Sequence, residues 1–435
     1  MPACRRLGPR PFPPQLPKMD RDLLTDLFST AVAAAQPALA VKSHLPERPR
    51  GRTIVIGAGK ASAQMAQAFE SAWDGPLEGL VVTRYGYAAP CQRIEIVEAA
   101  HPVPDAAGAL AARRIMEKVS GLGPDDLVVA LISGGGSALL AAPAPGMTLD
   151  DEQAVNAALL ASGAPIGAMN AIRNQLSQLK GGRLAALAAP ARVATLVVSD
   201  IPGDDPALVA SGPTLPMAST RADARRLVEL YGIALPPAAT AVLSSDANPA
   251  PRPTDAAFAR NSVAIIASAA LSLEAAAQKA TAMGLHPVIL SDAIEGEARE
   301  VAKVHAAIAR EVAARNRPFA KPAVILSGGE TTVTIRGSGR GGRNAEFLLS
   351  LAIGLDGVPG VAALAADTDG IDGMGDNAGA FCDGQSASRM RAAGVDPQAA
   401  LADNDAYTAF AAVGGLVVTG PTGTNVNDFR AIVVR

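Results

Sequence analysis

The sequence predicts an α/β protein with two α/β domains, the first built on a doubly wound parallel sheet. Apolar, β-branched runs alternate with alanine-rich helical stretches along nearly all of the 435 residues, which is the pattern of βαβ units. A proline- and alanine-rich stretch at 234–254 divides this alternation into two sets. The length of the chain also favours two to three domains.

The first set contains four strands that each end in Gly, Ser, Thr or Asp, residues that favour turns and helix N-caps. These strands are predicted at 53–59, 79–83, 127–133 and 194–200, with helices at 60–72 and 106–119. Their continuous apolar runs indicate strands that are buried in the middle of a parallel sheet. Such sheets bind ligands at the carboxyl ends of their strands.

The second set follows the 234–254 stretch, which we interpret as a linker or a partly helical hinge. Its strands are predicted at 262–268, 286–291, 322–328, 331–335, 360–368, 415–420 and 430–435, and its helices at 269–283, 295–315, 344–354 and 385–393. The strand at 331–335 follows its neighbour after a tight Gly-Gly-Glu turn and is therefore expected to be antiparallel to it. We expect a ligand cleft between the two domains.

Composition argues against several classes of function. The formal net charge is −3 and only 3% of the residues are aromatic, which disfavours nucleic-acid binding. The apolar runs are short or broken by Gly, Asp and Arg, so no membrane span is predicted. Cys4, Cys91 and Cys382 show no pairing pattern, which favours a reducing, cytoplasmic location. The Pro/Arg-rich residues 1–18 are expected to be disordered, with Met19 as an alternative start.

The most informative segment is 325–347, with the sequence ILSGGETTVTIRGSGRGGRNAEF. Its glycines leave the backbone N–H groups free to approach an anion, and its arginines match phosphate or carboxylate oxygens. They are Gly337, Gly339, Gly341 and Gly342, interleaved with Arg336, Arg340 and Arg343. A helix that starts near Asn344 would add a positive dipole end. The segment predicts a site for a small, multiply charged anion.

The stretch 55–65, VIGAGKASAQM, predicts a strand, a glycine turn and a helix. It resembles a dinucleotide fingerprint with Ser62 at the third glycine position, and a Walker A loop without its spacing, so neither motif is complete. Lys60, beside Gly57 and Gly59, lies where a helix N-terminus can meet an anion. The alternative is a surface lysine on the first helical turn.

Two further glycine turns carry polar side chains. Ser133 and Ser137 flank three glycines (134–136) after a buried strand, which favours an anion-binding nest over a simple tight turn. Lys180 and Arg183 flank two glycines and are candidates for ligand contact, whereas Arg173 fits a solvated basic face.

Aspartates suggest a metal site. Asp200 ends a buried strand and Asp204 follows a Pro-Gly turn, an arrangement that suits Mg²⁺, while Ser211 adds a donor. A second, glycine-rich loop at 365–384 holds five aspartates, among them Asp367, Asp369 and Asp372. Helix capping and Asx turns are the structural alternatives for both groups. Glycine nests, dispersed Lys/Arg and clustered Asp together favour phosphoryl transfer, and the absence of a Gly-x-Ser-x-Gly elbow disfavours acyl transfer.

Eight motifs occur in this order: GAGKAS, HPVPD, SGGGSALL, KGGRLA, SDIPGDDPALVASGPT, SGGETTVTIRGSGRGGRNAEF, DTDGIDG followed by AGA, and TGTNVND. In these motifs the chain resembles the class II glycerate 2-kinases, whose C-terminal part is called the MOFRL domain. The resemblance runs from about residue 22 to residue 435. It implies a Rossmann-like domain at 19–240 and a mixed-sheet α/β domain of MOFRL type at 255–435, with the active site in the cleft between them.

The resemblance also implies the activity: ATP-dependent phosphorylation of D-glycerate at its 2-hydroxyl, which gives 2-phosphoglycerate and ADP and uses Mg²⁺. The expected partners are D-glycerate and a nucleotide, without nucleic acid or membrane, and a homodimer stays an open alternative. In this family the lysine of the GAGKA motif and an arginine of the GRGGRN motif are proposed to act in transfer. Here these are Lys60 and either Arg340 or Arg343.

The predicted site assigns Lys60, Arg340 and Arg343 to catalysis and Asp200, Asp204 and Asp367 to the metal. The residues predicted to bind substrate or nucleotide are Gly57, Gly59, Ser133, Gly134, Gly135, Gly136, Ser137, Lys180, Arg183, Ser211, Gly328, Gly329, Glu330 and Asn344. Two other functions stay open at this point: an NAD(P)H-dependent hydroxypyruvate reductase and a non-catalytic sensor of phosphorylated ligands.

Overall fold

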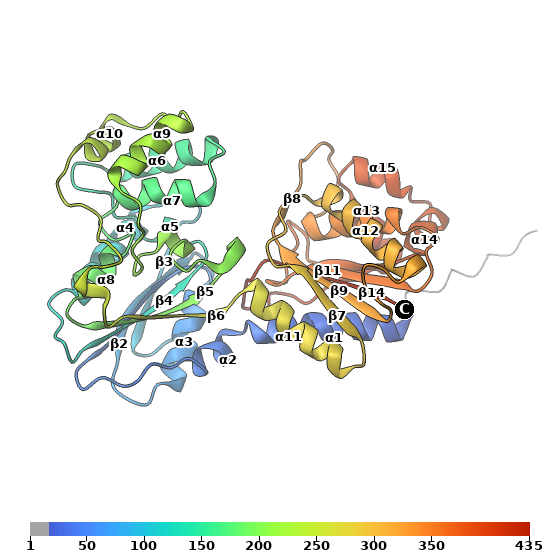
Figure 1. The fold of residues 1–435 in the computed structure, drawn as a ribbon, viewed down its shortest axis with the longest axis horizontal. Coiled ribbons are helices and arrows are strands. Elements are labelled where there is room, and N and C mark those ends of the chain that lie inside the picture. Colours follow the sequence, from blue (N-terminus) through green and yellow to red (C-terminus); the bar gives the residue numbers. More distant parts are fainter. Residues whose placement is uncertain (1–16) are drawn as a thin grey trace, which may run out of the picture. The chain divides into compact units, whose positions relative to one another are not determined.

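The computed structural model describes residues 17–435, which form two compact α/β units (Figure 1). The N-terminal unit is Ala35–Ser268, and the C-terminal unit combines Ala269–Arg435 with residues 17–34. The sequence predicts 19–34 in the first domain and 262–268 in the second, whereas the structure places each in the other unit. Residues 1–16 of the predicted disordered extension lie outside the described residues, and helix α1 (Lys18–Ala34) begins at the last residue of that extension.

The N-terminal unit contains a six-stranded sheet, entirely parallel, in the order β3-β2-β1-β4-β5-β6. The strands are β1 (Thr53–Ala58), β2 (Glu78–Arg84), β3 (Ile94–Ala99), β4 (Leu127–Ser133), β5 (Arg192–Val198) and β6 (Ser262–Ala267). The predicted doubly wound sheet is confirmed. Because the strand order reverses between β1 and β4, the connections from these two strands leave on opposite faces and open a crevice at their carboxyl ends.

Helices cover both faces of this sheet. Apolar side chains of α4 (Ala106–Val119), α5 (Gly136–Leu139) and α8 (Arg183–Ala188) pack with the strands in one core, while α2 (Pro37–Lys42) and α3 (Ser62–Ala72) complete the other side. Short 3₁₀ turns lie at Pro202–Asp204, Val209–Ser211 and Ala256–Phe258.

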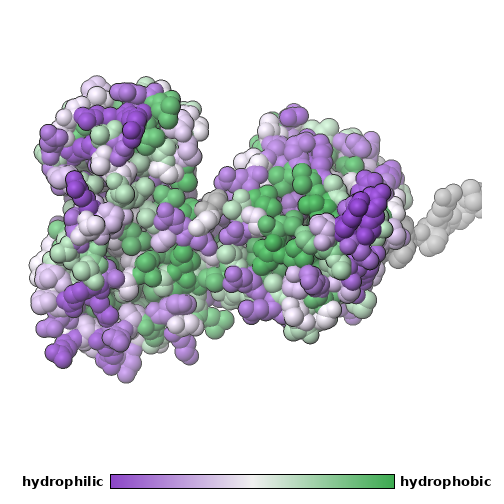
Figure 2. Space-filling model, viewed as in Figure 1, coloured by the Kyte–Doolittle hydropathy of each residue, from purple (hydrophilic) through white to green (hydrophobic). Residues whose placement is uncertain are grey.

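A helical lobe rises from the same unit (Figure 1). It consists of α6 (Leu149–Ala161), α7 (Ile166–Gln175), α9 (Arg221–Leu230) and α10 (Pro237–Ser244), which share a small apolar core. Hydrophilic side chains predominate over α9 in Figure 2, as its sequence RADARRLVEL predicts. The predicted hinge at 234–254 is therefore not a free linker, since α10 buries Ala239 and Leu243 in this core.

The C-terminal unit contains a mixed six-stranded sheet in the order β13-β12-β11-β14-β9-β7. All neighbours are antiparallel except β7 and β9, which are parallel. The strands are β7 (His286–Ser291), β9 (Ala323–Gly329), β11 (Val361–Asp367), β12 (Gly379–Asp383), β13 (Leu416–Val417) and β14 (Asp428–Val434).

The prediction that 331–335 pairs antiparallel with the preceding strand is wrong. Only Thr331–Thr332 (β10) are extended in a sheet, and they pair in parallel with β8 (Gly296–Glu297). The physical reason is that both edges of β9 are already occupied, one by β14 and the other by β7.

Helices cover both faces of this second sheet as well. The helices α12 (Ala298–Arg315) and α13 (Arg343–Gly354) pack on one face, and α1 and α11 (Ala269–Ala282) pack on the other (Figure 1). Leu24, Leu27 and Phe28 of α1 are buried against β14, which explains why the N-terminal helix belongs to this unit. Three short helices complete it: α14 (Ser386–Ala392), α15 (Pro397–Ala402) and α16 (Ala406–Ala411). None of the helices in residues 17–435 is long and apolar enough to cross a membrane.

Candidate active site

The carboxyl edge of the parallel sheet gathers several of the polar groups that the sequence singled out. Lys60 follows β1, the glycines 134–136 follow β4, and Asp200 follows β5. Arg84 ends β2 and His101 follows β3. Because all these strands run in the same direction, their ends bring these groups to one side of the N-terminal unit, at the crevice between β1 and β4.

The turn after β1 is fixed against the turn after β4 through backbone and hydroxyl contacts. The Lys60 amide donates to the Gly134 carbonyl over 2.9 Å, and the Ala61 amide donates to Ser133 Oγ over 3.0 Å. Gly59 has a φ of +143°, and a Cβ on it would lie 2.1 Å from Ser133 Oγ. The close approach therefore requires glycine at this position.

Two residues predicted to bind a ligand have structural roles in this junction. Ser133 is buried, and its Oγ is held by the Ala61 amide and by Ser62 Oγ at 3.1 Å, so it joins the two turns rather than facing a ligand. A Cβ on Gly57 would lie 2.4 Å from the Leu131 carbonyl oxygen, so this glycine allows β1 to pack closely against β4.

The glycine turn after β4 lies between a carboxylate and two basic side chains. A Cβ on Gly134 would lie 1.7 Å from Asp200 Oδ2, so only glycine leaves room for that carboxylate. A Cβ on Gly135 would lie 2.9 Å from His101 Nε2 and 3.3 Å from Lys60 Cγ. The predicted nest at 134–136 thus brings Asp200, His101 and Lys60 to one short stretch of backbone.

Lys60, Arg84 and His101 form a group of basic residues, and neither Arg84 nor His101 is among the residues that the sequence predicted for the site. Burial, together with the charges of Lys60 and Arg84, lowers the pKa of His101 to about 4, so its imidazole is neutral at pH 7. Arg84 stacks on Tyr87 with 3.7 Å between its Cζ and the ring centroid. Among residues 17–435, neither Lys60 nor Arg84 forms an ion pair with a carboxylate, so both remain available to an anionic ligand.

A chain of hydroxyls and amides supports the same edge. Ser137 Oγ lies 2.9 Å from Ser211 Oγ, and Ser211 Oγ donates to Asn170 Oδ1 over 2.9 Å. Ser211 is buried, whereas Ser137 is half-buried and closer to solvent. Of this predicted pair, Ser137 is therefore the better placed to meet a ligand.

The three basic residues at 173–183 have other partners. Lys180 is buried in an ion pair with Glu152, with 2.7 Å between Nζ and Oε1, which makes its predicted ligand contact unsupported. Arg173 is not on a solvated face as expected, since its guanidinium donates to Asn156 and Asn170. Arg183 lines a separate cavity in the helical lobe region, described below.

For the predicted metal, the described residues contain no group of three or more His, Cys, Asp or Glu side chains that could hold an ion. A kinase site needs fewer protein ligands, since Mg²⁺ takes one or two carboxylates together with substrate oxygens and water. Asp200 beside the glycine turn and the half-buried Asp204 fit that donor set. Asp367 does not, because Arg343 Nη2 and the Asp369 amide occupy its two oxygens.

In the C-terminal unit, backbone N–H groups of the glycine- and arginine-rich loop 336–343 donate to side chains of the protein itself. The amides of Arg336 and Gly337 donate to Asn404 Oδ1, that of Ser338 to Asp403, and that of Arg340 to Asp405. A Cβ on Gly337 would lie 2.2 Å from Asp403 Oδ1. The prediction that these glycines free the backbone for a bound anion is therefore wrong for 336–340, where they let the 403–405 turn approach instead.

The predicted anion position at the start of α13 is likewise occupied. Asp372 accepts from the amides of Asn344 and Ala345 at 3.0 and 2.8 Å. Burial raises the pKa of Asp372 to about 6, against the lowering effect of those two amides. The helix N-terminus thus binds an internal carboxylate.

Asp428 lies at the centre of the buried charge network of this unit. Its Oδ1 accepts from Arg343 Nε at 2.6 Å and from Asn344 Nδ2 at 2.8 Å, and its Oδ2 accepts from Arg430 Nη2 at 2.5 Å. Burial alone would lower the pKa of Arg343, but Asp428 and Asp367 raise it above its ordinary value. Arg343, which is partly exposed, and the buried Asn344 are both predicted to meet ligand and are instead held by Asp428.

The other predicted residues of segment 325–347 belong to the charge network around Asp428 or lie beside it. The Gly328 carbonyl accepts from Arg430, and a Cβ on Gly329 (φ +118°) would lie 2.3 Å from the Ile294 nitrogen. Glu330 is exposed and lies 3.6 Å from Arg343 Nη1. Arg340 is exposed as well, with its guanidinium over the Tyr407 ring at 4.2 Å from the centroid. Arg340 is thus the arginine of the pair that remains accessible.

Two family models and several known proteins match this chain. The family model described as a domain of unknown function, DUF4147, matches residues 23–244, and the MOFRL family model matches residues 323–428. A protein of Agrobacterium vitis, provisionally named hydroxypyruvate reductase, is 56% identical over 417 residues and covers 95% of this chain and 94% of its own.

Two findings concern Thermotoga maritima. Its D-glycerate 2-kinase is 39% identical over 414 residues, which are 95% of this chain and 98% of that protein. The crystal structure of glycerate kinase from the same organism superposes with a TM-score of 0.89 at 38% identity, and covers 96% of this chain and 100% of that one.

The pKa of His101 predicts a response to acid. Its pKa is about 4 in the folded protein and about 6.5 when unfolded, so the unfolded state binds more protons between these values. The stability contributed by the neutral imidazole is fully present above pH 6.5 and is lost as the pH falls towards 4. The variant His101→Gln should therefore lose less stability than the wild type over this range. Urea unfolding of both proteins at pH 7 and pH 4.5 measures the loss in the free energy of unfolding. Equal losses in the two proteins would refute the lowered pKa of His101.

Replacement of Asp428 tests the charge network. Asp428→Asn keeps the shape of the side chain but leaves Arg430, which is fully buried, without its charged partner, while Arg343 keeps its ion pair with Asp367. We expect a loss of about 3–5 kcal/mol in the free energy of unfolding of the C-terminal unit, measured in urea. Asp356→Asn, which removes an exposed ion pair with Arg391, is the matched control and should change stability by less than about 1 kcal/mol. Equal effects of the two variants would contradict the central role of Asp428.

Proposed function

Because the chain belongs to the glycerate kinase family, we propose that it transfers the γ-phosphoryl group of ATP to the 2-hydroxyl of D-glycerate, giving 2-phosphoglycerate and ADP. The observation that carries the proposal is the basic group at the crevice of the parallel sheet, where Lys60 has no carboxylate partner among the described residues. The name of the Thermotoga relative, D-glycerate 2-kinase, supports the substrate and the position of transfer.

Phosphoryl transfer depends mainly on positioning and on stabilising negative charge. Lys60 is next to the glycine turn 134–136, so its ammonium and the turn's backbone can bind the same phosphate oxygens. His101 is neutral at pH 7 and can share a hydrogen bond with substrate without adding charge. Asp200 and Asp204 would hold Mg²⁺, which neutralises charge on the phosphates when bound.

For the arginine that acts in transfer, the proposal favours Arg340 over Arg343. The guanidinium of Arg343 is neutralised by Asp367 and Asp428, at 2.6 Å from each. Arg340 is exposed and is held by Tyr407 rather than by a carboxylate. The location of the active site between the two units stays a prediction, as does the cytoplasmic location of the enzyme.

A hydroxypyruvate reductase is the second candidate, favoured by the provisional name of the Agrobacterium relative. Two features of the first βα unit disfavour it. Ser62 stands at the third glycine position of the fingerprint and bonds to Ser133. Arg84 ends β2, where NAD-binding domains carry an acidic residue for the ribose. Arginine suits the extra phosphate of NADP, so NADPH belongs in the test.

The deciding experiment compares two reactions on the purified chain. The proposal expects D-glycerate to stimulate ADP release from MgATP, and expects no oxidation of NADH or NADPH with hydroxypyruvate. Lys60→Met, which keeps most of the side-chain volume, should lower the rate of ADP release at least about a hundredfold. Lys42→Met, at the exposed end of α2, is the matched control and should retain full activity.

Each arm of the experiment can contradict the proposal. Reduction of hydroxypyruvate without ATP would favour the reductase, and ligand-induced stabilisation without ADP release would favour a sensor. Near-full kinase activity of Lys60→Met would leave the kinase assignment standing but would remove Lys60 from its proposed role.

A further inference from the structure

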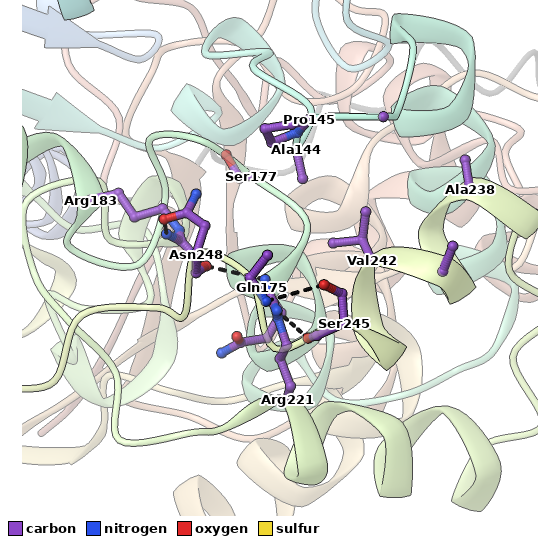
Figure 3. Close-up of a pocket in the computed structure, with 13 residues that line it drawn as sticks. Ala144, Pro145, Gln175, Ser177, Arg183, Arg221, Ala238, Val242, Ser245 and Asn248 are labelled. Atoms are coloured by element: carbon purple, nitrogen blue, oxygen red, sulfur yellow. Dashed lines mark hydrogen bonds between the residues drawn. The ribbon is translucent and has the colours of Figure 1, made fainter.

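A second pair of basic side chains lies in the N-terminal unit, around a cavity of about 260 Å³ (Figure 3). Arg183 begins α8 and Arg221 begins α9, and both line this cavity. Its remaining lining comes from 144–146, from Gln175 and Ser177, and from residues of α10 and the loop after it. Asp246 in that loop is exposed and is not a lining residue. None of the lining residues is shared with the group around Lys60, and none is acidic.

The cavity is short of negative charge. Arg183 is only 8% exposed, and burial together with the charge of Arg221 lowers its pKa to about 10. Both arginines occupy the first position of a helix, where the helix dipole disfavours a cation. Asp223, the acidic residue in the first turn of α9, is committed to Thr220 and Arg226.

The hydrogen bonds of the two guanidinium groups go to neutral acceptors in the loop after α10 (Figure 3). Arg183 donates to Asn248 Oδ1 and the Pro249 carbonyl, both at 3.2 Å, and to the Asn248 carbonyl at 3.1 Å. Arg221 donates to the carbonyls of Ser245 and Asn248. The buried Nε–H of each arginine has no acceptor among residues 17–435.

Two adjacent guanidinium groups without a carboxylate partner are the arrangement that recognises an anion, since charge-assisted bonds are stronger than bonds to neutral carbonyls. The loop that now supplies those carbonyls is exposed from Ser244 to Pro249, so its acceptors can be replaced. The other wall of the cavity is apolar and includes Ala144, Ala238 and Val242. The volume is below the roughly 300–1,000 Å³ of pockets for drug-sized ligands, which favours a small ligand.

We propose that this cavity is a second binding site, for a small organic anion that carries a carboxylate or phosphoryl group and a short apolar part. The arginines bind the anionic group, and the alanine and valine side chains contact the apolar part. The site is separate from the phosphoryl-transfer centre and does not depend on the proposed kinase activity.

Binding of phosphoenolpyruvate, measured by calorimetry on the full chain, tests this proposal. This three-carbon anion has a carboxylate and a phosphoryl group, and it lacks a hydroxyl that could accept a phosphoryl group. We expect it to bind to the wild type and equally to Lys60→Met. Arg221→Gln should weaken binding about tenfold or more, because it removes charge-assisted hydrogen bonds. Arg226→Gln, five residues further along the same helix and exposed, is the matched control and should bind as the wild type does.

Arg183→Lys is the second variant, because it keeps the charge of Arg183 and loses the forked geometry; it should also weaken binding. Melting curves without the anion establish that each variant is folded. The proposal is overturned by absence of binding to the wild type at millimolar concentration, by unchanged binding to Arg221→Gln, or by loss of binding in Lys60→Met. Inorganic phosphate serves as a second probe, and if it bound as tightly as phosphoenolpyruvate the proposed apolar contact would be wrong.

Discussion

The pairing of buried charges separates the side chains that hold this fold from those that are left for a ligand. Asp428 accepts from Arg343 and Arg430 in the interior of the C-terminal unit, and such a network is costly to break because a single unpaired charge remains buried. Lys60 and Arg84 at the edge of the parallel sheet have no such partner among the described residues. Arg183 and Arg221 in the helical lobe region likewise form no ion pair with a carboxylate among the described residues.

Glycines occur both in the loop 336–342 and in the candidate ligand site at 134–136. The charges of the neighbouring side chains determine whether the protein itself or a ligand occupies the space beside them. In the loop 336–342 the glycines admit the 403–405 turn and Asp372, so side chains of the protein itself, Asp403, Asn404 and Asp405, take the backbone donors of 336–340. At 134–136 the neighbours include Lys60 and His101 beside one carboxylate, Asp200. That combination of a lysine, a neutral histidine, a glycine turn and a carboxylate for Mg²⁺ is suited to the phosphates of a nucleotide.

The sequence predicts most of the fold because continuous apolar strands and amphipathic helices carry a local signal, as in β1, β4 and α13. It does not predict partners distant in the chain: α1 packs on β14 and β6 joins the first sheet through pairings that no local pattern encodes. At the site, Lys60 and the turn 134–136 follow from motifs. The roles of Arg84 and His101 depend on tertiary contacts, which the sequence does not predict. The same holds for the ion pair between Arg343 and Asp428.

The central claim, that the nucleotide phosphates bind at the edge of the parallel sheet, is tested most directly by hydrogen–deuterium exchange. The measurement compares the free chain with the chain bound to a non-hydrolysable ATP analogue, Mg²⁺ and D-glycerate. The account predicts slower exchange of the amides in 57–62 and 133–137, which surround Lys60 and the glycine turn. Slower exchange confined to 336–343, with no change in those two segments, would contradict it.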